Sequence, residues 1–391
     1  MRFPGFSGEW EQSTIGKCCN ELEYGMNAAA KEFDGVNKYI RITDIDEKSS
    51  TYKNNDIVSP DGDLDDKYIV RENDILFART GASRGKTYIY NPNDGVLYFA
   101  GFLIRANVKT HYDSKFIYQQ TKLSRYNKWV NIMSARSGQP GINSQEYSTY
   151  KLFLPTIEEQ QKVSAFINLL DKRIEAQNKI IEDLKKLKVA ICNQLLNNKT
   201  LLNKTAPLST FGELKNGYAF KSSTYVPNGS YNIITIANVS GDREIATDSC
   251  NTISSVPTDI QSHQILKSGD ILISLTGNVG RVSLNKGNNN LLNQRVGLFV
   301  PNNSISAEFL YQILSFVQFE KSMINLAQGA AQMNIGKGDI ESYQVRYSDN
   351  HQLINTISRI LLDYDKKIEI ENKYFQSLLS QKSYLLSNMF I

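Results

Sequence analysis

Two stretches of the chain repeat apolar residues at alternating three- and four-residue spacings, a pattern typical of coiled-coil helices. The apolar positions of the first stretch are Ile167, Leu170, Ile174, Ile181, Leu184, Ile191 and Leu195. Those of the second, each 194 residues after its counterpart, are Leu361, Tyr364, Ile368, Phe375, Leu378, Leu385 and Met389. A single apolar stripe usually packs on its own globular domain. Because this stripe occurs twice in matching form, it predicts two long helices that pack against each other.

Four polar residues interrupt the two seams at equivalent places: Gln177 and Lys188 in the first, Glu371 and Lys382 in the second. Polar residues at such positions often fix the register of a coiled coil at a cost in stability. The four residues either specify the pairing in this way or lie at its flank. Each seam runs about four heptads without Pro or Gly, longer than the ~10–14 residues of an average helix. It therefore predicts a rod of roughly 40 Å.

The regions that precede the two helices also repeat each other. Both consist of short strand-like runs punctuated by Gly, Asn, Asp and Pro. Matching pieces include residues 40–45 with 234–239, 116–119 with 309–312, and 142–143 with 333–334. The predicted fold is mixed α/β (α+β), with two similar, mostly strand-built domains separated by two long antiparallel helices in a pseudo-twofold repeat. The predicted boundaries are 1–156 for the first domain, 157–206 for the central helix and linker, 207–349 for the second domain and 350–391 for the C-terminal helix.

Composition and charge narrow the class of protein. Hydrophobic residues make up 41% of the 391 residues, enough for two separate cores. No apolar run approaches the ~18–20 residues of a membrane helix, and the four cysteines form neither a metal-ligand pattern nor an evident disulfide framework. We therefore expect a cytoplasmic, globular protein. The net charge of +4 neither demands nor excludes nucleic acid, since binding needs a local basic face rather than a high total.

If the chain binds DNA, the candidate contacts are glycine-rich loops that carry Arg, Lys, Asn or Gln, because small residues let the backbone approach phosphates while those side chains read base edges. In the first domain they offer Arg79, Thr80, Arg84, Lys86, Arg136, Gln139 and Asn143. In the second domain they offer Asn278, Arg281, Gln294, Arg295, Gln332, Asn334 and Lys337. The alternative for each loop is an ordinary turn after a buried strand, and Asn143 and Asn334 have the further alternative of capping the next segment.

Four short motifs occur along the chain in a recognisable order. They are Arg2-Phe-Pro-Gly-Phe, Asp74-Ile-Leu-Phe-Ala-Arg-Thr-Gly, Leu154-Pro-Thr-Ile-Glu-Glu-Gln and Leu170-Asp-Lys-Arg-Ile-Glu. Together with the 194-residue duplication, they make the chain resemble the DNA specificity subunits of type I restriction-modification systems. One stretch departs from the family pattern, because Ser348-Asp-Asn-His-Gln stands where the family often repeats the Pro and Glu-Gln before the second helix.

The resemblance implies two target-recognition domains that bind double-stranded DNA at a bipartite, asymmetric site. It implies helices that dock two modification (methyltransferase) subunits, joined in the full complex by two restriction subunits. Those partners would methylate adenine N6 with S-adenosylmethionine, or cleave DNA with ATP and Mg. On this chain itself we expect no bound cofactor, no metal and no catalytic residue.

The residues agree with a non-catalytic role. None of the nine prolines is adjacent to another, so the Asn/Asp-Pro-Pro-aromatic loop of an amino-methyltransferase is absent. No phosphate-binding Gly-x-x-x-x-Gly-Lys-Ser/Thr motif occurs either. The three histidines, His111, His263 and His351, lie far apart in the sequence. We therefore expect any chemistry to belong to partner subunits.

Apolar residues outside the seams, represented by Leu187 and Leu386, predict a further surface on the helices. We expect the modification subunits to dock there. Two other classes of protein remain open at this point. A stand-alone DNA-binding regulator would need no such surface, and a coiled-coil adaptor would gather proteins without binding DNA.

Overall fold

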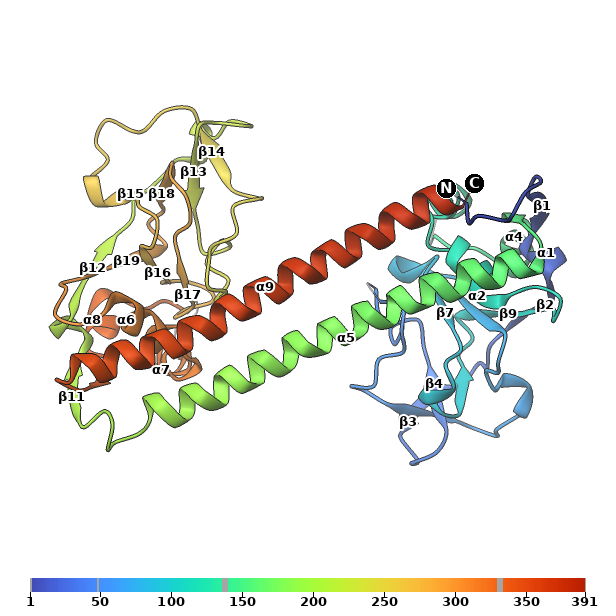
Figure 1. Ribbon diagram of the computed structural model, residues 1–391, viewed down its shortest axis with the longest axis horizontal. Helices are drawn as coiled ribbons and strands as arrows, with labels where there is room; N and C mark the ends of the chain where they lie inside the picture. Colours follow the sequence, from blue (N-terminus) through green and yellow to red (C-terminus); the bar gives the residue numbers. More distant parts are fainter. Residues whose placement is uncertain (1, 48, 136–139, 329–332, 391) are drawn as a thin grey trace. The chain divides into compact units, whose positions relative to one another are not determined.

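Figure 1 shows a computed structural model of the chain, which describes residues 2–47, 49–135, 140–328 and 333–390. The predicted mixed α/β fold is confirmed, with two repeated domains and two long helices. The chain divides into two compact units: unit 1 comprises Met1–Gln177 and Tyr374–Ile391, and unit 2 comprises Asn178–Lys373. Each unit therefore contains one domain together with part of both long helices, a division that crosses the boundaries expected from sequence.

The two long helices are α5 (Ile157–Leu196) and α9 (His351–Met389). Helix α9 forms although the chain departs from the family pattern just before it. Asn350 supplies the missing start signal, because its Oδ1 accepts a hydrogen bond from the backbone N–H of Leu353 at 3.0 Å. A side-chain acceptor at this place satisfies one of the free N–H groups of the first helical turn.

Unit 1 is built around the four-stranded antiparallel sheet β2-β9-β6-β7. Its strands are β1 (Glu11–Thr14), β2 (Cys19–Tyr24), β3 (Ala29–Glu32), β4 (Lys38–Ile40), β5 (Val58–Asp61), β6 (Asp74–Ala78), β7 (Thr87–Ile89), β8 (Leu97–Phe99), β9 (Leu103–Val108) and β10 (Lys151–Leu154). Its shorter helices are α1 (Ile15–Cys18), α2 (Ser114–Gln120), α3 (Ser124–Met133) and α4 (Ser144–Ser148). Smaller pairings join β1 to β10, β3 to β5, and β4 to β8 in parallel.

Unit 2 repeats this plan, with the sheet β12-β19-β16-β17 in the place of β2-β9-β6-β7. Its strands are β11 (Lys204–Pro207), β12 (Gly212–Asn216), β13 (Tyr231–Ile234), β14 (Asn251–Ile253), β15 (Ile265–Leu266), β16 (Ile271–Ser274), β17 (Val282–Leu284), β18 (Asn290–Leu292), β19 (Val296–Pro301) and β20 (Gln344–Tyr347). Its shorter helices are α6 (Ala307–Leu314), α7 (Val317–Ala327) and α8 (Lys337–Glu341). The pairs β11-β20 and β13-β18 correspond to β1-β10 and β4-β8. The duplication inferred from sequence is thus a duplication of topology.

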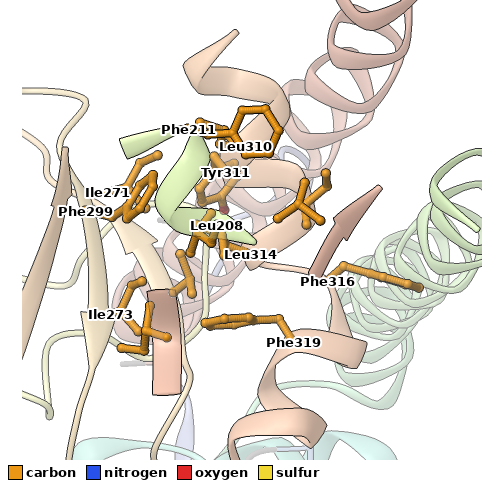
Figure 2. Close-up of a cluster of buried hydrophobic side chains, with 14 of the residues drawn as sticks. Leu208, Phe211, Ile271, Ile273, Phe299, Leu310, Tyr311, Leu314, Phe316 and Phe319 are labelled. Carbon is orange, nitrogen blue, oxygen red and sulfur yellow. The ribbon is translucent and has the colours of Figure 1, made fainter. Parts of the chain in front are cut away.

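The core of unit 2 lies between its main sheet and helices α6 and α7. Figure 2 shows Ile271, Ile273 and Phe299 from the sheet facing side chains such as Leu310 and Phe319 from the helices. The end of α5 and the start of α9 add further buried residues to this cluster, namely Cys192, Leu196, Ile354, Ile357 and Leu361. In unit 1 the start of α5 and the end of α9 do the same, through Val163, Ile167, Leu170, Leu378, Leu385, Leu386 and Met389. Each long helix is therefore part of both cores.

All fourteen predicted seam residues are buried or half-buried. Several of them, including Ile167 and Leu361, pack on a globular core rather than on the other long helix alone. The two interpretations of the stripe are thus combined in one surface. A helix that buries its seam against a domain and a second helix gains apolar burial from both, at roughly 25 cal/mol per Å².

The two seam lysines lie in matching ion pairs between α5 and α9. In unit 2, Lys188 Nζ lies 2.5 Å from Asp365 Oδ1, and in unit 1, Lys382 Nζ lies 2.6 Å from Asp171 Oδ1. A glutamine from the domain joins each pair, since Gln312 Nε2 donates to Asp365 at 2.7 Å and Gln119 Nε2 to Asp171 at 3.4 Å. Both lysines therefore lie at the contact between the two helices, and each ion pair favours this register of α5 and α9.

The other two polar seam residues behave differently. Gln177 is buried, whereas Glu371 is half-buried and pairs with Lys367 of its own helix at 2.5 Å.

Within the described ranges, none of the helices combines the length and the apolarity that a membrane span needs.

Candidate nucleic-acid interface

In unit 1 three segments that are distant in sequence meet at one end of the main sheet. The backbone N–H of Arg79, just after β6, donates to the carbonyl of Phe102, in the turn before β9, at 3.0 Å. The carbonyl of Arg79 accepts from the N–H of Ile142 at 2.8 Å, and Thr80 forms an isolated antiparallel bridge with Gly141. The two predicted loops of the first domain therefore lie side by side.

Unit 2 makes the same arrangement. The N–H of Leu275, after β16, donates to the carbonyl of Arg295, before β19, at 3.0 Å. The carbonyl of Leu275 accepts from Ile335 N–H at 2.9 Å, and Thr276 bridges Asn334. The structure thus brings together the loop that contains Asn278, the turn that contains Arg295 and the segment that contains Asn334.

These hydrogen bonds correct one alignment made from sequence. Ile142 and Ile335 make the same bond, so residues 142–143 correspond to 335–336, and the expected match with 333–334 is wrong by two residues. Asn143 and Gly336 are accordingly the N-caps of the equivalent helices α4 and α8. The error arose because a similar Ile/Met-Asn pair occurs two positions too early in the second copy.

The capping alternative separates the two asparagines. Asn143 Oδ1 accepts from the N–H of Glu146 at 2.8 Å, and Glu146 Oε2 accepts from the N–H of Asn143 at 2.8 Å, which makes a reciprocal capping box. Its side-chain oxygen is therefore committed to α4. Asn334 is exposed and does not cap α8, so only for Asn143 is the capping interpretation supported.

The basic side chains of the first loop are held against the domain. The Arg79 guanidinium lies over the Tyr24 ring at 4.9 Å, and Tyr24 Oη accepts from the N–H of Ser144 at 3.1 Å. Arg84 Nε donates to Ser134 Oγ at 2.8 Å. Lys86 is half-buried, like Thr80. These contacts fix Arg79 and Arg84 in place and reduce the conformational entropy that a ligand would have to remove.

In unit 2 the predicted side chains are more open. Arg281 and Lys337 form weak, partly exposed ion pairs, with Glu320 at 3.3 Å and Glu341 at 3.5 Å. Asn278, Gln294 and Arg295 are exposed. Three predicted contacts, Arg136, Gln139 and Gln332, lie outside the described residues.

Two glycines that the sequence did not single out set the spacing of this end of each sheet. A Cβ on Gly25 would lie 2.2 Å from the carbonyl oxygen of Ala100, and a Cβ on Gly217 would lie 2.1 Å from that of Asn293. Such distances are far inside van der Waals contact. The chain therefore requires glycine at both places for β2 and β12 to cross the turns that carry the candidate contacts. The signal available in the sequence was that the two glycines occupy equivalent places.

The predicted docking surface is only partly accessible. Leu187 on α5 is 46% exposed, but Leu386 on α9 is only 8% exposed and belongs to the core of unit 1. The expectation that Leu386 lies on an open surface is wrong, because the globular domain of unit 1 covers the end of α9. Ile180 and Val189 of α5 are exposed to a similar degree as Leu187.

Among the described residues, no group of three or more His, Cys, Asp and Glu side chains is arranged to hold a metal ion. Of the histidines, His111 packs against Tyr112 with ring centroids 4.1 Å apart and planes inclined at 46°, and His263 Nε2 lies 3.0 Å from the carbonyl oxygen of Asn216.

Comparison with known proteins assigns both repeats of the chain to one family. The sequence profile of the type I restriction modification DNA specificity domain matches residues 8–186 and again residues 203–379. The chain belongs to this family. The two matches cover most of the sequence and reproduce its internal repeat.

Two members of this family are similar along most of their length. The type I restriction enzyme MjaVIII specificity subunit of Methanocaldococcus jannaschii is 25% identical over 353 residues, which cover 83% of this chain and 79% of the relative. The putative MjaX specificity subunit of the same organism is 23% identical over 338 residues, covering 82% and 78%.

Solved structures have the same fold. The S subunit of the type I restriction-modification system from M. genitalium aligns with a TM-score of 0.64 at 16% identity, covering 100% of this chain and 99% of that chain. A structure from work on complex assembly and conformational transition of the type I R-M system aligns with a TM-score of 0.56 at 15% identity, covering 97% of each chain. Membership in a DNA specificity family makes the converging loops of each unit the candidate DNA-recognition surface.

Proposed function

We propose that this chain recognises a bipartite, asymmetric DNA site and directs the adenine-N6 methylation and restriction that partner subunits carry out. Unit 1 reads one half of the site and unit 2 reads the other. The observation that carries the proposal is the repetition of one loop arrangement in both units with different side chains at its surface, such as Ala82 after Thr80-Gly81 in the first loop and Asn278 after Thr276-Gly277 in the second. Equal scaffolds with unequal side chains suit two unlike half-sites.

The division of labour follows from the same proposal. The chain supplies the sequence specificity. Two modification subunits transfer the methyl group from S-adenosylmethionine, and two restriction subunits cleave DNA with ATP and Mg. A regulator or a simple adaptor is disfavoured, because the chain and its relatives share a specificity-subunit family along most of their length.

Single-molecule sequencing of adenine methylation tests the proposal directly. Cells that carry this chain with its modification subunit are compared with cells that lack the chain. A bipartite N6-methyladenine motif that depends on the chain is the expected result. If the complex assembles but no such motif appears, the proposal fails. Exchange of residues 1–156 for the domain of another family member should change one half of the motif and leave the other intact.

Partner docking can be tested on α5. We place part of the docking surface around Leu187 and Ile180, which are exposed and lie seven residues apart, hence on one face of the helix. Glutamate at Leu187 should weaken co-purification of the modification subunit without unfolding the chain. The matched control is Lys186→Glu, which also adds a carboxylate at an exposed, neighbouring position of α5. If both variants retain the modification subunit equally, Leu187 is not part of the docking surface.

A further inference from the structure

The turns before β9 and β19 occupy the same place in the two units. In unit 1 the turn is closed by Leu103 N–H donating to the carbonyl of Ala100 at 2.8 Å, and in unit 2 by Val296 N–H donating to that of Asn293 at 2.9 Å. The bonds from Arg79 to Phe102 and from Leu275 to Arg295, both 3.0 Å, then identify the third residue of each turn as equivalent. Phe102 in unit 1 therefore stands where Arg295 stands in unit 2.

Backbone hydrogen bonds from the preceding residue hold both turns in the same position relative to the segments that follow β2 and β12. The residue before Phe102, Gly101, donates its N–H to the carbonyl of Met26 at 2.8 Å. The residue before Arg295, Gln294, donates to the carbonyl of Tyr218 at 2.9 Å. With the close approach at Gly25 and Gly217 described above, these bonds present the two side chains from equivalent, preorganised positions. The backbone that carries each side chain is therefore fixed before a ligand binds, and its ordering adds no further entropic cost to binding.

Both side chains are available to a ligand. The Phe102 ring is 59% exposed, which is unusual for a large apolar side chain next to the core of a sheet. The Arg295 side chain is exposed and forms no hydrogen bond or ion pair with another residue in the described part of the chain. By contrast, Arg79, Arg84 and Arg281 are each occupied by a neighbour. Phe102 is thus a large open side chain of the unit 1 loop cluster, and Arg295 is an open cation of the unit 2 cluster, beside the exposed amides of Asn278 and Gln294.

The chemistry of the two side chains selects different bases. An arginine that approaches the major groove can donate two hydrogen bonds to O6 and N7 of guanine, the commonest specific contact. A phenyl ring can neither donate nor accept such a bond, and the only apolar group on the base edges of that groove is the thymine methyl.

We propose that Arg295 and Phe102 are equivalent base-reading residues, and that Arg295 selects a guanine in one half-site whereas Phe102 selects the 5-methyl group of a thymine in the other. The inference rests on the proposed function, since it assumes that both loop clusters face DNA. It adds the side chain and the base at one position of each half-site.

The test uses the assembled complex of this chain with its modification subunit and duplexes that carry its methylation motif. Arg295→Ala should reduce discrimination in favour of guanine at one position by roughly 5- to 150-fold, the span of a good bidentate contact. It should leave the other half-site unchanged. Lys199→Ala, which removes one charge from an exposed site in unit 2, is the matched control and should weaken binding slightly without changing the motif.

For Phe102, uracil replaces thymine one position at a time, which deletes only the methyl group. One such replacement should lower the methylation rate of the wild-type complex about fourfold. This is the factor that corresponds to the free energy of burying one methyl group. The same replacement should have no effect on Phe102→Ala. Val36→Ala, which truncates another exposed apolar residue of unit 1, should respond to uracil as the wild type does.

The outcomes separate the two proposals. If the wild-type chain yields no chain-dependent motif, the proposed function fails and the assignment of readers fails with it. If the motif forms but Arg295→Ala keeps its guanine preference, or no uracil replacement distinguishes wild type from Phe102→Ala, the function stands and the inference is overturned. If both variants alter the same half-site, the equivalence of the two turns is refuted. Relaxed choice at a single base pair, with the rest of that half-site still recognised, excludes misfolding of the unit as the cause.

Discussion

The two copies of the helix ion pair are chemically alike but differ in burial, and this difference predicts unequal effects of the same substitution. Asp365 and Lys188 in unit 2 have side chains that are 9% and 17% exposed, whereas Asp171 and Lys382 in unit 1 are 32% and 26% exposed. Arg243 NH1 also donates to Asp365 Oδ2 at 3.1 Å. Asp365 therefore holds donors on both carboxylate oxygens.

Replacing Asp365 with asparagine turns one acceptor into a donor that faces Lys188 or Arg243. Removal of one partner from a buried pair costs about 3–5 kcal/mol. Arg243 keeps a second carboxylate, since its NH2 lies 2.6 Å from Glu308 Oε2, so we reduce the expected loss to about 2–4 kcal/mol. For Asp171→Asn, the partial exposure of the pair limits the loss to about 0.2–1 kcal/mol.

Native-state hydrogen exchange is the suitable assay, because it reports the free energy of opening for each unit separately. Asp365→Asn should accelerate exchange of the slowest amides of β16 and β19 by roughly 30- to 900-fold, at 1.36 kcal/mol per tenfold. Asp171→Asn should accelerate those of β6 and β9 by no more than about fivefold. Equal effects of the two variants, or a larger effect of Asp171→Asn, would refute the argument from burial.

Two further predictions concern the half-buried cation Lys122 and the glycine at position 217. Burial, together with the nearby Lys382 charge, lowers the pKa of the Lys122 ammonium to about 7. The unfolded chain binds that proton up to about pH 10.4, so the stability of unit 1 should rise between about pH 7 and pH 10. The urea midpoint of Lys122→Met should not show this rise with pH. A rise equal to that of the wild type would show that Lys122 is not its cause. Gly217→Ala should displace the turn at Asn293 and abolish recognition of one half-site, measured by methylation sequencing, whereas Gly338→Ala, which meets open space, should leave the motif unchanged. Recognition that survives Gly217→Ala would show that the turn tolerates the shift.

Periodicity allowed the fold to be predicted because it records local requirements. The apolar positions of α5 and α9 must face one side at every turn, so the seam from Ile167 to Leu195 is visible without knowledge of any partner. Periodicity does not say which surface covers a given position. Leu386 lies off the seam of the helix pair, yet the globular domain of unit 1 buries it, and no local pattern reveals that contact.

The candidate site was predictable in its location but not in its details. Gly, Arg and Asn mark loops, and the loops around Arg79 and Asn278 indeed meet other predicted segments. Phe102 escaped notice because an aromatic residue beside a strand usually belongs to the core, and its 59% exposure depends on a turn that only the fold defines. Alignment of the two copies failed near Asn334 because Met333-Asn334 resembles Ile142-Asn143 in sequence, whereas the bridges that fix the true register, Thr80 to Gly141 and Thr276 to Asn334, are visible only in the fold.

The ion pairs between the long helices have a consequence for how such a chain could have arisen. Asp171 and Lys188 lie on α5, and their partners Lys382 and Asp365 are the same two residue types 194 positions later. Each half of the sequence thus carries both the acid and the base, and is self-complementary. An ancestor of half the length would have formed both pairs with a second copy of itself, as an isologous dimer. Duplication and fusion of such an ancestor would have required no new interface, and would have left the fused domains free to diverge.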